Sequence, residues 1–132
     1  MELADFVATM PHAVALGIEL TAATKDEATA TMPWREDLCT IGGTVHGGVL
    51  MAFADSVGAI VAFLNLPEGA GTSTIESKTN FFRPVSSGQA HATTRCIHAG
   101  RTTVVVQTEV RDDAGKLVSL TTQTQAVIPP RS

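Results

Sequence analysis

A single carboxylate in an apolar stretch is the residue whose type and position most suggest chemistry. Asp55 is the only charged residue between positions 45 and 64, where most of the others are Ala, Val, Leu, Ile, Met or Phe. A carboxylate that is removed from water needs compensating hydrogen bonds. It is either a structural group held by backbone or hydroxyl donors, or a general base or nucleophile tuned by its surroundings. The sequence leaves both interpretations open.

A glycine-rich segment leads directly into the same stretch. It reads Gly-Gly-Thr-Val-His-Gly-Gly over residues 42–48. Glycines at the start of a helix let a ligand approach the backbone, where the first N–H groups lack intrahelical partners. At the positive end of the helix dipole, such donors stabilise an oxygen that gains negative charge. The alternative is a tight turn that only packs, which a Gly-Gly pair by itself favours.

The spacing of these two features predicts that a shared site needs two chains. Gly47 and Asp55 are eight residues apart, which is about 12 Å along a helix. The Asp side chain leans toward the helix N-terminus but recovers only part of that distance. One reacting carbonyl therefore cannot easily touch both groups of one chain. If they act together, two antiparallel helices should lie side by side in a symmetric dimer.

The elements that must position these residues follow from hydrophobic periodicity and turn signals. The spacing predicts a short amphipathic helix over 3–10, a new turn from Pro11 that stops at Gly17, and a long apolar helix over 45–64. Short turns between the later strands make them antiparallel neighbours. Strands are expected at 18–24, 28–32, 72–83, 89–99, 102–111 and 116–127.

A helix that is apolar nearly all round cannot lie on the surface of a protein. Its natural cover is a curved antiparallel sheet made by the later strands, which predicts an α+β architecture. The third of the later strands alternates most clearly, with Val104, Val106, Thr108 and Val110 on one face. A chain of 132 residues suits one domain, and we expect residues 1–132 to form it.

Composition excludes several classes of function. Nine Lys and Arg against thirteen Asp and Glu give a formal net charge of −4, which leaves no basic stripe for nucleic acid. Asp55 at the middle of the apolar stretch disfavours a membrane span. Cys39 and Cys96 are expected to be reduced thiols in a cytoplasmic protein, and acidic Glu2 and Asp5 argue against an export signal. No His or Cys spacing suggests a metal site.

Longer runs of sequence resemble a known family. The pattern Gly43-x-x-His46-Gly47-Gly48 with Asp55 is similar to the hotdog-fold acyl-CoA thioesterases of the phenylacetate-pathway (PaaI-like) group, which are related to 4-hydroxybenzoyl-CoA thioesterases. The resemblance covers essentially the whole chain and implies a hotdog fold, an antiparallel sheet wrapped around one long helix. It also implies hydrolysis of an acyl-CoA or aroyl-CoA to a free acid and CoA, without a metal or redox cofactor. The other matching segments are 11–19, 74–84, 98–102 and 108–115.

The resemblance implies a role for each residue that matches the family's motif. Asp55 would be the catalytic carboxylate, as base for water or as nucleophile, and the N–H of Gly47 would polarise the thioester carbonyl. His46 would help to hold the loop or the thioester. Thr74 falls where several members place a hydroxyl that orients the attacking water, with Ser73 as the substitute if the register is off by one.

One position departs from the family pattern. Thr40 stands where the family often has Asn or Gln, and a hydroxyl reaches less far than an amide. The resemblance also suggests contacts to the CoA part of the substrate, because arginine binds phosphate through two oxygens at once. The residues expected there are Gly48, Arg83, Arg101, Thr102, Thr103 and Arg131.

Partners and rival functions complete the expectations. The match implies a homodimer or a homotetramer built as a dimer of dimers, with no nucleic-acid or membrane partner. A hydratase or dehydratase on the same fold is one rival, although the carboxylate on the long helix favours hydrolysis. A non-catalytic acyl-CoA binding module or ligand sensor is the rival from another class, and Thr40 keeps it open.

Overall fold

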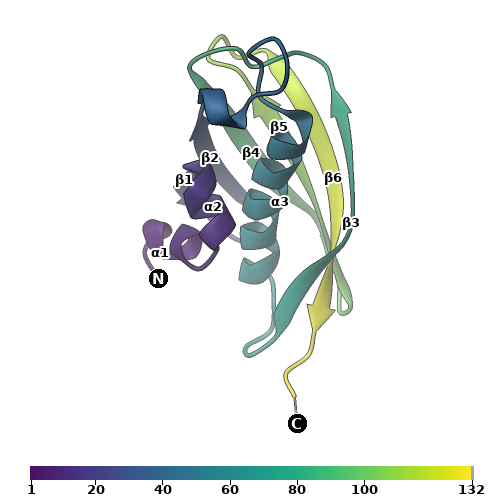
Figure 1. Cartoon of the computed structure of the whole chain (residues 1–132). Coiled ribbons are helices and arrows are strands. Elements are labelled where there is room, and N and C mark those ends of the chain that lie inside the picture. Colours follow the sequence, from purple (N-terminus) through teal and green to yellow (C-terminus); the bar gives the residue numbers. More distant parts are fainter. Residues whose placement is uncertain (132) are drawn as a thin grey trace.

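A six-stranded antiparallel sheet curls around one long helix, α3 (Gly47–Leu64), in the computed structural model, which describes residues 1–131 (Figure 1). This is the hotdog fold. Two short helices precede the sheet, α1 (Leu3–Ala8) and α2 (Pro11–Leu16), and a single 3₁₀ turn η1 (Glu36–Leu38) follows its second strand. The strands are β1 (Glu19–Ala23), β2 (Glu27–Pro33), β3 (Gly71–Phe81), β4 (Gln89–Ala99), β5 (Thr103–Arg111) and β6 (Leu117–Ile128).

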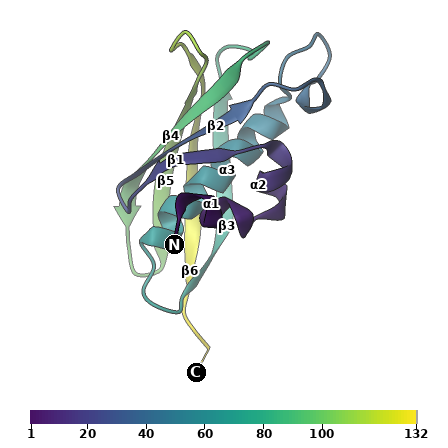
Figure 2. The same ribbon diagram turned by 90° about the vertical axis from the view of Figure 1, so that its left-hand side faces the viewer.

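Helix α3 lies against the inner face of the sheet (Figures 1 and 2). By length and composition it could span a membrane, since its mean hydropathy is 1.9 over 18 residues. Its apolar character is accounted for by packing, because one face is buried in the core with Leu50, Phe53, Val57 and Val61. The helix ends at Asn65, whose side-chain amide donates to the carbonyl of Val61 at 2.9 Å.

The helix begins two residues later than the apolar stretch predicts. Val45 forms an isolated β-bridge with Cys39, and its N–H donates to the carbonyl of Val85 at 2.9 Å, so its backbone is extended. His46 is the N-cap, and its Nδ1 accepts from the N–H of Gly48 at 2.8 Å. A tertiary contact of Val45 therefore sets the first residue of the helix.

The order of strands in the sheet is β1-β2-β4-β5-β6-β3, and every neighbouring pair is antiparallel. Although β3 follows α3 in the chain, it lies at the sheet edge beside β6, with register from Gly71 opposite Ile128 to Phe81 opposite Ser119. This return brings the first half of β3 alongside the middle of α3. The predicted alternation in β5 is confirmed, since Val104, Val106, Thr108 and Val110 are buried.

Strand β3 leaves an unusual edge. It is 11 residues long, nearly all of them exposed or half-buried, and it pairs on one side only. Ile75 on this strand is 59% exposed, and Phe81 and Phe82 at its end are also exposed. A long edge strand with unpaired backbone groups and apolar side chains is a template for pairing with another chain.

Candidate active site

The Asp55 carboxylate lies half-buried on α3, facing β3 and β6. Its Oδ1 accepts two hydrogen bonds, from the hydroxyl of Thr74 and from Nε2 of Gln123, each at 2.7 Å. Thr74 rather than Ser73 makes this contact, because neighbouring side chains on a strand point to opposite faces. Among the described residues no donor reaches Oδ2, so this oxygen is available to a ligand or water.

A second layer of hydrogen bonds holds Thr74. The side-chain amide of Gln125 donates to the Thr74 hydroxyl at 2.8 Å, and its carbonyl oxygen accepts from Thr72 at 3.2 Å. The Thr74 hydroxyl therefore accepts from Gln125 while it donates to Asp55. This fixes the direction of its proton toward the carboxylate.

The sequence reasoning did not identify the two glutamines. Gln123 and Gln125 are 0% and 1% exposed, and they continue an inward-facing polar row on β6 that starts with Ser119 and Thr121. A strand with polar residues at every second, buried position is uncommon, because most buried positions are apolar. The alternation over residues 117–128 was therefore the signal that could have located them.

Gly58 makes room for Gln123 on the surface of α3. A Cβ built on Gly58 would overlap the side-chain oxygen of Gln123, so no larger residue fits without displacing the amide. The same oxygen, Oε1, is buried and has no hydrogen-bond partner within residues 1–131. A buried carbonyl oxygen that loses its water costs free energy. The position that lets Gln123 donate to Asp55 thus lowers the free energy of unfolding of the protein.

The first turn of α3 presents one free backbone donor among the described residues. Because His46 accepts from the N–H of Gly48, that group is already engaged, whereas the N–H of Gly47 has no partner in the described part of the chain. The ring of Phe81 lies over Gly47, with Cζ 3.3 Å from where a Cβ would be. Gly47 is therefore exposed to a ligand from one side only.

A cavity of about 380 Å³ surrounds this donor. Thr40 and Gly47 line it together with Phe82 and Arg83, so the position that departs from the family pattern lies beside the predicted oxyanion donor. Asp55 is not among its lining residues. Within one protomer the carboxylate and the Gly47 N–H therefore do not share a cavity.

The candidate phosphate ligands lie at opposite ends of the sheet. The N–H of Arg83 donates to the carbonyl of Val118, near the start of β6. Thr103 pairs with Ala126, eight residues further along that strand, which is about 26 Å. Arg101 and Thr102 form the turn before Thr103, and Arg131 follows the end of β6. A single chain does not bring Arg83 together with Arg101, Thr102, Thr103 and Arg131.

Comparisons with known proteins identify relatives over most of the chain. A family model described as "Thioesterase superfamily" matches residues 42–119. A protein of Haemophilus influenzae named "Putative esterase" is 35% identical over 113 residues, which cover 86% of this chain and 82% of its own. A solved thioesterase from the same organism has a TM-score of 0.93 and 30% identity, covering 100% of this chain and 94% of that one. A mutant thioesterase of Pseudomonas aeruginosa has a TM-score of 0.92 and 30% identity, covering 98% and 95%.

The two glutamines should respond differently when they are replaced by methionine, a residue of similar shape. Gln123→Met removes one hydrogen bond and also the unpartnered Oε1, so we expect the free energy of unfolding in urea to change by less than about 0.5 kcal/mol. Gln125→Met removes the amide that donates to Thr74 and an oxygen that shares the Thr72 proton with the carbonyl of Ala126, and should cost about 1–3 kcal/mol. Equal losses of unfolding free energy in the two variants would contradict the assignment of Gln123 as the side chain with one unpartnered polar atom.

Proposed function

Because this chain belongs to the thioesterase superfamily, we propose that it hydrolyses acyl-CoA or aroyl-CoA thioesters to a free acid and CoA, as a member of the PaaI-like group. The observation that supports this most is the Asp55 carboxylate, which is fixed through Oδ1 by Thr74 and Gln123 while Oδ2 stays open. A carboxylate held in one orientation is suited to general-base or nucleophilic work. We further propose that residues 1–132 act as one domain in the cytoplasm.

The reaction follows from the open oxygen. As a general base, Oδ2 of Asp55 takes a proton from water while the water oxygen bonds to the thioester carbon. The carbonyl oxygen becomes an oxyanion, which the Gly47 N–H stabilises from the end of the α3 dipole. The C–S bond then breaks, and CoA leaves as a thiolate that takes up a proton. As a nucleophile, Oδ2 would attack the same carbon and expel the CoA thiolate as the C–S bond breaks, and water would hydrolyse the resulting anhydride.

The catalytic groups are proposed to come from two chains. Gly47 and Asp55 occupy separate places in one protomer, and the unpaired β3 edge offers a surface for a second copy. Antiparallel pairing of two such edges would place Gly47 of the partner subunit opposite Asp55 and so form two equal sites. We propose a homodimer of this kind, or a homotetramer made from two of them.

Such a dimer also explains the separated phosphate candidates. Arg83 lies at the Gly47 end of its protomer, whereas Arg101, Thr102, Thr103 and Arg131 lie beyond Asp55. An antiparallel arrangement brings opposite ends of the two chains together. Arg83 of one chain and the Arg101 turn of the other would then flank the same site and bind the CoA phosphates.

His46 and Thr40 have supporting roles in this proposal. His46 keeps the first turn of α3 in place through its bond to the Gly48 N–H at 2.8 Å. Thr40 lines the cavity beside Gly47, where its hydroxyl would add a second donor to the thioester oxygen. Gly48 has no side chain and would let the substrate approach the backbone closely. Its N–H would not bind the substrate, because it already donates to His46.

Removal of the carboxylate charge tests the chemistry. Asp55→Asn keeps the shape of the side chain but cannot accept a proton, so turnover of an acyl-CoA should fall at least ~10²-fold, as measured by thiol release. Ser56→Ala, the next residue on α3, serves as the control and should change turnover little. Near-normal turnover in folded Asp55→Asn protein would overturn the mechanism. Thioester binding without turnover in the wild type would favour the non-catalytic binding module.

Mixing two inactive variants tests the shared site. Gly47→Pro removes the proposed donor at the first position of α3, where the helical backbone suits proline and the Phe81 ring has to shift slightly away from the new Cβ. After exchange of subunits with Asp55→Asn protein, half of the dimers are hybrid and each has one intact site. Activity should therefore recover to roughly a quarter of that of the wild type. No recovery, when mass spectrometry shows that hybrid dimers have formed, would rule out sites built from two chains.

The arginine proposal predicts an effect on binding rather than on chemistry. Contacts to the CoA phosphates are equal in the ground and transition states, so Arg83→Ala and Arg101→Ala should raise KM for acyl-CoA several-fold with kcat little changed. The same variants should leave KM unchanged for a truncated thioester that lacks the nucleotide. If both substrates respond equally, these arginines do not bind the CoA phosphates.

A further inference from the structure

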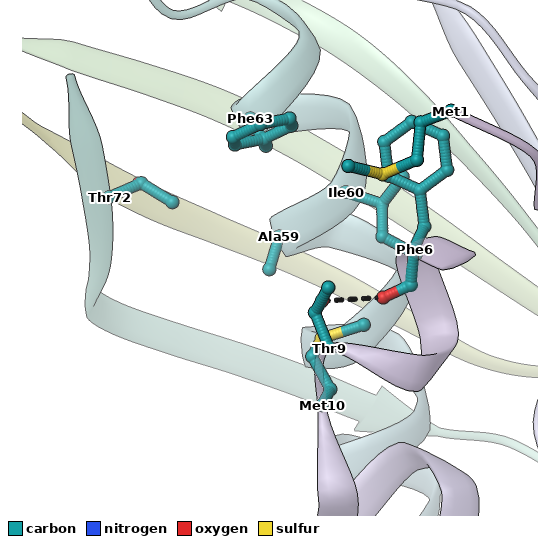
Figure 3. A pocket seen from close by; sticks show the side chains of 8 residues that line it. All are labelled: Met1, Phe6, Thr9, Met10, Ala59, Ile60, Phe63 and Thr72. Carbon is teal, nitrogen blue, oxygen red and sulfur yellow. Dashed lines mark hydrogen bonds between the residues drawn. The ribbon is translucent and has the colours of Figure 1, made fainter. Parts of the chain in front are cut away.

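A second cavity lies along the second half of α3, beyond Asp55 on the side away from Gly47. Its volume is about 340 Å³, near the lower end of the range for small-ligand sites. Figure 3 shows that α1 and its continuation close it on one side and the second half of α3 on the other. The apolar side chains that line it include Phe6, Met10, Ala59, Ile60 and Phe63.

This cavity begins one helical turn from the carboxylate. Ala59 follows Asp55 by four residues, which places it one turn further along the same face of α3. Thr72, another lining residue, precedes Thr74 by two and shares its face of β3. Gln125 binds both of these hydroxyls, at 3.2 and 2.8 Å. When the thioester carbon is held at Asp55, the acyl group attached to it therefore reaches the cavity within one helical turn.

The walls of the cavity offer no hydroxyl proton to a ligand. No charged residue lines it, and its two hydroxyls donate elsewhere: Thr9 to the carbonyl of Phe6 at 2.7 Å, and Thr72 to the carbonyl of Ala126 at 2.8 Å. Phe6 and Phe63 meet edge to face, with ring centroids 6.3 Å apart. A hydroxyl substituent that is buried here loses its water and finds only the neutral oxygens of Thr9 and Thr72 as acceptors in exchange.

The cavity at Gly47 is mixed in character, because polar residues line it together with apolar ones such as Val45, Leu50 and Phe81. Thr40, Thr44 and Arg83 are among its lining residues, so it suits the polar portion of a substrate. The two cavities thus differ in chemistry as the two halves of a thioester do.

We propose that the cavity beyond Asp55 holds the acyl group of the substrate and restricts it to groups that are apolar along their whole length. This inference rests on the proposed function, because it assigns the acyl side of the same site. The class comprises short or medium aliphatic chains and single unsubstituted rings. Hydroxylated acyl or aroyl groups are disfavoured, and α1 determines how long the group can be.

Matched substrates and a cavity-filling variant test this proposal. For the wild type, kcat/KM should be about 10- to 100-fold lower for 4-hydroxyphenylacetyl-CoA than for phenylacetyl-CoA. Ala59→Leu fills the cavity, and should lower kcat/KM for hexanoyl-CoA at least ~10-fold but for acetyl-CoA less than about twofold. Ala15→Leu makes the same change on the exposed face of α2 and is the control. Phe6→Ala enlarges the cavity and should shift the preferred chain length upward, which keeps a test available if Ala59→Leu does not fold.

A binding measurement separates this proposal from the hydrolytic function. Calorimetry with nonhydrolysable 2-oxoalkyl-CoA thioethers of increasing length reports cavity occupancy without turnover. Affinity that rises with chain length in the wild type, and no longer rises in Ala59→Leu, supports the proposal even if no thioester is hydrolysed. Hydrolysis in which neither chain length nor the ring hydroxyl matters overturns it and leaves the hydrolytic function standing. Neither binding nor hydrolysis would overturn both.

Discussion

Burial of α3 against the inner face of the sheet is the constraint on which the rest of the structure depends. The helix is so apolar that only a curled sheet can remove its face from water, and six strands are arranged to do so. That packing carries β3 back along the helix to the far edge of the sheet. Asp55 then faces β3 and β6 at mid-helix, because the helix and both strands are held in register by the core.

The buried polar row on β6, from Ser119 to Gln125, shows how polar side chains are accommodated within such a core. Gln123 and Gln125 occupy buried positions at which valine would serve packing better. Gly58 gives up a side chain so that Gln123 fits, and the Oε1 of that amide stays without a partner in the described structure. Local compromises of this kind are typical of sites where orientation matters more than stability. Gln123 donates to the Asp55 carboxylate directly, and Gln125 acts on it through Thr74.

The two sides of Asp55 differ in chemistry because different elements close them. Toward the start of α3, the loop before the helix and the end of β3 contribute hydroxyls, an arginine and a free backbone donor. Toward the end of α3, the N-terminal segment contributes apolar side chains and one hydroxyl, that of Thr9, which donates to the carbonyl of Phe6. A thioester is polar on its CoA side and, for many acyl groups, apolar on the other. The proposed division of the site follows that asymmetry.

The sequence by itself determined the class of fold and the residue around which the proposed site is built. The apolar stretch, the alternation in β5 and the turn residues each report local physics, so the predicted helices and strands lie within a few residues of those observed. Asp55 stood out because one charge among apolar residues is visible without coordinates. Tertiary structure alone decided that Val45 is extended, that Thr74 rather than Ser73 meets the carboxylate, and that Gln123 rests on Gly58. It also separated Arg83 from the Arg101 turn. These facts depend on strand order and register between residues distant in the chain, which no local pattern encodes.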